Sequence, residues 1–106
     1  MSISVEKIKK NAKKYFQTGT DYGFMTEQLV AFLGEDIIGA PLAPKANMYG
    51  AYDGALIQHS LWVTQSALLL NDLLPDENKI DKTSIIKVCL LHLIGKAKMF
   101  KPCALS

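Results

Sequence analysis

With 106 residues, of which 49% are hydrophobic and 21% charged, the chain can form one compact core and is far from the composition of disordered segments. Its formal net charge of +2 is too small to indicate nucleic-acid binding by itself. Two cysteines without a CxxC spacing predict no disulfide framework, and no apolar run is long enough for a signal peptide or a membrane span. We therefore expect a single cytoplasmic domain over residues 1–106.

The first element expected is an amphipathic helix from Val5 to Phe16, which Gly19 would stop. Its apolar residues recur at steps of three and four: Val5, Ile8, Ala12, Tyr15 and Phe16. Lysines fill the opposite face, among them Lys7, Lys10 and Lys14. Such a run is most often a solvated face, and the alternative is a stripe that contacts phosphates or a partner.

A short helix over residues 27–33, capped by Thr26, precedes a long segment from Gly34 to Gly54. The glycines and prolines of that segment exclude a continuous helix, while its apolar and aromatic residues suit contact with a core. We expect a packed loop that lies across the helices. Tyr49 and Tyr52 are candidate partner-binding residues in this loop, with core packing as the alternative.

The longest helical pattern runs from Gly54 to Leu74 and is apolar on more than one stripe, which predicts a central helix buried on several sides. After an acidic connection, a last helix from Ser84 to about Ile94 is expected, with Asp81 or Thr83 as its cap and Gly95 as its stop. No alternating strand pattern occurs. The sequence predicts an all-α, compact bundle of four to five helices.

The two histidines fall on the two most apolar helices. His59 and His92 each share a helical face with apolar neighbours, which predicts that both imidazoles point inward. An inward histidine is more often a hydrogen-bonded core residue than a metal ligand. A pair of histidines on neighbouring helices modestly favours a metal site.

Two segments carry a resemblance to a known family. Residues 50–63, Gly-Ala-Tyr-Asp-Gly-Ala-Leu-Ile-Gln-His-Ser-Leu-Trp-Val, resemble the loop and helix that bear the first metal-binding histidine of HD-domain proteins. Residues 88–96, Val-Cys-Leu-Leu-His-Leu-Ile-Gly-Lys, are similar to the Leu-Leu-His-Asp-Ile-Gly-Lys signature of that family. The resemblance implies a helical, metal-dependent phosphohydrolase fold in which two histidines and two aspartates hold divalent ions. His59 and His92 match the histidine ligands, and Lys96 matches a possible phosphate contact.

The chain departs from this family at the aspartates. Leu93 stands where the signature has aspartate, and no acidic residue follows Asp81 to supply the second one. Two imidazoles without anionic oxygens are a poor site for hard divalent ions. We therefore predict a non-catalytic HD-like binding module without a cofactor. The alternative is a metal-dependent phosphohydrolase for nucleotides or phosphoesters, with a divalent metal at His59 and His92.

The expected partner of such a module is a protein or a nucleoprotein, with direct nucleic-acid binding as a further alternative and no membrane contact. The candidate contact residues are the two loop tyrosines and five lysines: Lys7, Lys10, Lys14, Lys96 and Lys98. The narrowest form of the hypothesis is a phage or mobile-element inhibitor that acts on a host defence or nucleic-acid machine.

Overall fold

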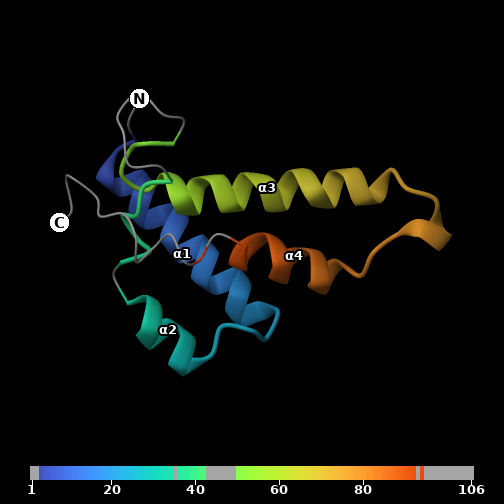
Figure 1. Cartoon of the computed structure of the whole chain (residues 1–106), viewed down its shortest axis with the longest axis horizontal. Helices are drawn as coiled ribbons and strands as arrows, with labels where there is room; N and C mark the ends of the chain where they lie inside the picture. Colours follow the sequence, from blue (N-terminus) through green and yellow to red (C-terminus); the bar gives the residue numbers. More distant parts are fainter. Residues whose placement is uncertain (1–2, 35, 43–49, 93, 95–106) are drawn as a thin grey trace.

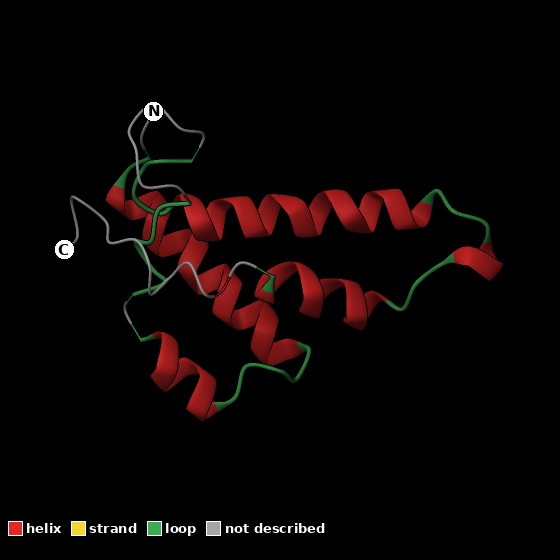
Figure 2. Cartoon of the chain, viewed as in Figure 1, coloured by secondary structure: helices red, strands yellow, loops and turns green. Residues whose placement is uncertain are grey.

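The computed structural model describes residues 3–34, 36–42, 50–92 and 94, and every regular element in these ranges is helical (Figures 1 and 2). The elements are α1 (Val5–Asp21), α2 (Glu27–Leu33), α3 (Ala55–Asp72), the short 3-10 helix η1 (Asp76–Asn78) and α4 (Lys82–Leu91). The predicted all-α class is confirmed. None of these described helices is both long enough and apolar enough to cross a membrane.

Local hydrogen bonds explain where two of the helices begin. The Thr26 hydroxyl accepts a hydrogen bond from the Leu29 amide at 3.1 Å at the start of α2. The Asp81 carboxylate does the same for the Ser84 amide at 3.1 Å at the start of α4. Each cap satisfies an amide that has no partner inside its helix. The caps expected at Thr26 and Asp81 are confirmed, and Thr83 lies within α4 instead.

The end of α1 differs from the prediction, because the helix continues through Gly19 to Asp21. Gly19 is buried, and a Cβ atom at this position would lie 2.8 Å from the Met25 side chain. The Phe24 and Met25 amides donate to the Gly19 carbonyl at 3.1 and 3.2 Å. The chain after α1 therefore folds back onto this residue. Gly19 permits close packing within the helix and does not stop it.

The helices are arranged around an antiparallel pair. α3 and α4 lie side by side, joined through η1, and α1 packs against both of them, while α2 lies at the far side of α1 (Figure 1). The side chains at the centre of this arrangement are almost completely inaccessible: Tyr15, Leu33, Ile37, Leu56, Ile57 and Leu90. The core thus draws one or more residues from each of the four α-helices and from the loop before α3.

The described parts of the segment between α2 and α3 pack onto the core. Ile37, Ala40 and Leu42 are buried. The Leu42 amide donates to the Gly50 carbonyl at 2.8 Å, and the Leu56 amide donates to the Ala40 carbonyl at 3.0 Å. These bonds fix the loop to the first turn of α3, which confirms the expected packed loop for the described residues. Residues 43–49 lie outside them.

Candidate functional site

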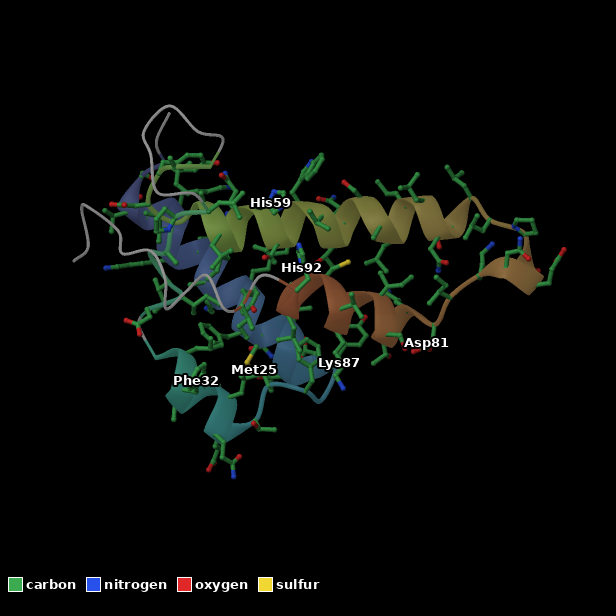
Figure 3. The ribbon with its side chains drawn as sticks, in the orientation of Figure 1. Met25, Phe32, His59, Asp81, Lys87 and His92 are labelled. Atoms are coloured by element: carbon green, nitrogen blue, oxygen red, sulfur yellow. The ribbon has the colours of Figure 1, made fainter. Side chains whose placement is uncertain are left out.

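The structure brings the two histidines together between α3 and α4 (Figure 3). The His59 and His92 ring centroids are 6.3 Å apart, with the ring planes tilted by 45°. The Trp62 ring lies one helical turn further along α3, 6.4 Å from His59. The three rings form a row that begins on α3 and ends on α4.

The expectation that both imidazoles point inward is wrong for His92. His59 is half-buried, but His92 is exposed because α4 ends at Leu91 and His92 is its C-terminal cap. The His92 Nδ1 atom lies 2.6 Å from the Cys89 carbonyl oxygen. A carbonyl oxygen can only accept, so Nδ1 carries a proton and donates it to Cys89. The ring is therefore oriented by the last turn of its own helix.

Cys89 is the third titratable side chain in this region. Burial raises the pKa of its thiol above the ordinary value, and a hydrogen bond with Thr64 opposes that rise more weakly. The thiol is therefore protonated at neutral pH. A raised pKa makes the thiolate less available, which weakens this cysteine as a nucleophile.

The residues around the histidines do not fit a hydrolytic metal centre. Among the described residues, no group of three or more histidine, cysteine, aspartate or glutamate side chains is placed to hold a metal ion. Catalytic zinc sites use three protein ligands, and hard ions such as magnesium need carboxylate oxygens. Position 93, where the HD signature has its aspartate, is leucine and lies outside the described residues. Two imidazoles alone leave the metal without an anionic ligand.

The lysines expected to contact a partner lie on the solvent side of α1. Lys7, Lys10 and Lys14 are exposed, and their steps of three and four place them on one stripe, which we call the lysine face. None of the three forms an ion pair with another described residue. The lysine face is therefore an exposed basic strip with no acidic partner within the described part of the chain. Lys96 and Lys98 lie outside that part.

The two tyrosines have different outcomes. Tyr49 lies outside the described residues. Tyr52 is half-buried, and its hydroxyl donates a hydrogen bond to the Gln58 side-chain oxygen on the first turn of α3. Tyr52 therefore packs within the fold, which is the alternative that the sequence left open, and it is not an exposed anchor for a partner.

One surface was missed by the sequence reasoning. Trp62, Leu69 and Leu70 on α3, together with its C-terminal cap Leu73, are between 62% and 81% exposed, and we call this group the outer face. The composition of α3 predicted a helix buried on several sides, and this prediction is wrong for the side that carries the outer face. The spacing of seven residues between Trp62 and Leu69, with Leu73 one turn further, was the signal that could have identified it.

No protein-family model, curated protein or solved structure matches this chain. The likeness of the two histidine segments to HD domains thus stays a resemblance of motifs.

Proposed function

We propose that the chain is a non-catalytic, HD-like binding module that engages a protein or nucleoprotein partner through the lysine face. The observation that carries the proposal is the exposed stripe of Lys7, Lys10 and Lys14, which no described acidic side chain neutralises. Lys9 and Lys13 are also exposed on α1 and extend the positive charge around the helix.

The geometry of the stripe suits an extended anionic surface. Lys7 and Lys14 are two helical turns apart, so their Cα atoms are separated by about 10 Å along the helix axis. Long, flexible lysine side chains reach phosphates or carboxylates without a fixed binding geometry. A partner that presents a row of negative charges would release counterions on binding, and the interaction would weaken as salt is added.

The non-catalytic part of the proposal is supported by the chemistry of the histidine site. His59 and His92 lie close together, but the donors around them do not complete a metal centre and the nearby Cys89 thiol is protonated. The narrower form of the proposal is a phage or mobile-element inhibitor directed at a host defence or nucleic-acid machine. Machines of that kind expose phosphates or the acidic surfaces of their protein subunits, which the lysine face would contact.

The test replaces the lysine face and measures binding to two defined polyanions. Fluorescence anisotropy with a labelled DNA duplex and with labelled polyglutamate would compare the wild type with the triple variant Lys7→Ala, Lys10→Ala, Lys14→Ala. We expect the wild type to bind at least one probe at low salt. For the duplex, three phosphate contacts predict a log–log salt slope of about −3, and their removal should weaken binding by roughly tenfold or more.

The matched control removes three lysines that lie outside α1: Lys79, Lys82 and Lys87. Lys87 lies on α4 (Figure 3), and all three are exposed, so the net charge falls by the same amount as in the α1 variant. We expect the control to bind like the wild type. Equal losses in the two triple variants would show that only net charge matters. That result, or no binding to either probe, would contradict the proposal.

The second candidate function is a metal-dependent phosphohydrolase, and the observation that favours it is the 6.3 Å separation of the His59 and His92 rings. Because the donor set lacks a third ligand, we expect untagged protein with manganese to release phosphate from nucleotides no faster than the His59→Ala variant. Metal analysis accompanies the assay. One manganese or iron ion per chain, with hydrolysis that His59→Ala abolishes, would reverse the order of the two candidates.

A further inference from the structure

The outer face of α3 is unusual because it lies opposite the side that packs against the rest of the fold. Thr64 is buried, and the Asn71 side-chain amide donates to the Ile80 carbonyl at 3.0 Å, so this side of α3 packs against the rest of the described chain. Trp62, Leu69 and Leu73 project from the other side, where no other described segment accompanies the second half of α3 (Figure 1). Contiguous exposed apolar surface of this kind marks an interaction site.

We propose that the outer face pairs with the outer face of a second copy of this chain, so that two α3 helices form a symmetric dimer. The spacing is that of helix pairing: Trp62 and Leu69 are seven residues apart, as are Ser66 and Leu73. These positions recur on one stripe over three turns of the helix. A partner helix with the same repeat would keep its side chains in contact along this length.

Because the outer face carries no charged side chains, a second copy of this chain suits it as a binding partner. α3 contains no lysine, arginine, aspartate or glutamate between Ala55 and Asn71. The same face can therefore meet itself around a two-fold axis without like charges being brought together, as an isologous interface requires. An acidic or basic partner would find no complementary charge here, in contrast to the lysine face on α1.

A two-fold axis perpendicular to α3 gives a register that fits the side-chain sizes. In an antiparallel pair centred between Ser66 and Leu69, Trp62 of one copy lies opposite Leu73 of the other, and Leu69 lies opposite Ser66. The small Ser66 side chain leaves room for Leu69 at the centre, where two packed helices approach to about 8–10 Å. Leu70 flanks this seam.

The exposed area is sufficient for a weak but specific interface. The four side chains of the outer face expose on the order of 500 Å² in one copy, so that pairing would bury about 1,000 Å² in total, near the lower end of specific interfaces. Trp62 supplies the type of large aromatic anchor that dominates binding energy in such interfaces. We therefore expect a dissociation constant in the micromolar range.

Two measurements on the full chain test the dimer. Sedimentation equilibrium from low-micromolar to several-hundred-micromolar protein would report the mass. Fluorescence over the same range would report the environment of Trp62, which is the only tryptophan and is 62% exposed in the monomer. We expect a monomer–dimer equilibrium in which the emission maximum shifts to shorter wavelength as dimer forms. A monomer at every concentration would overturn the proposal.

Variants locate the interface. Leu69→Glu places a charge at the centre of the seam and should raise the dissociation constant by at least roughly 30-fold, as for a hot-spot residue. Leu73→Glu tests the edge of the seam at a side chain that is 81% exposed, so its effect does not depend on the core. Phe32→Glu is the control, because Phe32 is 61% exposed but lies on α2, away from α3 (Figure 3).

The control should dimerise like the wild type. A dimer that survives both leucine variants, or one that Phe32→Glu abolishes equally, would place the interface elsewhere and contradict the proposal. The lysine face and the outer face are on different helices, so the two proposals are tested separately. Dimerisation can be absent while polyanion binding is observed, and polyanion binding can be absent while dimerisation is observed.

Discussion

Replacing Gly54 with alanine is expected to lower the free energy of unfolding by about 2–4 kcal/mol. Gly54 is the N-terminal cap of α3 and has φ of 82°, in the left-handed region where a Cβ atom is unfavourable. A Cβ atom here would also lie 2.6 Å from the Ile8 side chain, which is buried on α1. The backbone conformation and the steric overlap add, because the buried Ile8 side chain must leave its position in the core to relieve the overlap.

The measurement is equilibrium unfolding in urea followed by far-UV circular dichroism. Gly23→Ala is the matched control: Gly23 has φ of 80°, but a Cβ atom there would meet no heavy atom within 4 Å. The control should lose only the backbone contribution, about 1–2 kcal/mol. Equal losses at Gly54 and Gly23 would show that the contact with Ile8 does not limit the packing of α1 on α3.

Caps were predictable from sequence because they depend on residues three positions apart. Thr26 and the Leu29 amide, like Asp81 and the Ser84 amide, form hydrogen bonds that the local chain brings together whatever the rest of the fold does. The start of α2 at Glu27 follows from its cap as expected, whereas α4 starts at Lys82, directly after Asp81, and not at Ser84 as expected. Local polar chemistry therefore fixed the boundaries that were expected correctly.

Gly19 and the outer face were not predictable in this way, because both depend on contacts with distant residues. In the sequence, Gly19 is typical of a helix end. The structure shows that the Met25 side chain packs onto it instead, within the helix. α3 has apolar residues on opposite sides, and only the arrangement of its neighbours decides that Thr64 faces α4 while Trp62 faces solvent. Periodicity identifies the apolar stripes of a helix. It does not show which of them the few other helices of a small domain will bury.

The histidine site was predicted in part. The placement of His59 and His92 on neighbouring helices agrees with their ring separation of 6.3 Å. The exposure of His92 was missed because it depends on where α4 ends, which is at Leu91 and not near Ile94. Helix ends are set by competing carbonyl partners, and the Cys89 carbonyl here bonds to the His92 ring.

Replacing Tyr15 with phenylalanine is expected to cost about 1–3 kcal/mol at neutral pH. Tyr15 is 1% exposed, and its hydroxyl donates a hydrogen bond of 2.6 Å to the Leu90 carbonyl. Leu90 is in the last turn of α4, where carbonyls lack partners within the helix, so the bond satisfies a buried acceptor and joins α1 to α4. Phenylalanine keeps the ring packing and removes only this hydrogen bond.

The same hydroxyl predicts a loss of stability in alkali. Burial raises the pKa of Tyr15 to about 12 from its ordinary value of 10.0. Between pH 10 and pH 12 the unfolded chain therefore releases this proton while the folded chain keeps it. The stabilisation is complete below pH 10 and is lost as the pH rises through 12, by about 2–3 kcal/mol in total.

Urea unfolding at a series of pH values from neutral to alkaline would measure this loss. Tyr15→Phe removes the titrating group, so its stability should fall less steeply above pH 10 than that of the wild type, and the two curves should converge. Tyr22→Phe leaves the Tyr15 hydroxyl in place and should keep the steeper dependence. Parallel wild-type and Tyr15→Phe curves would mean that ionisation of this phenol does not open the contact between α1 and α4.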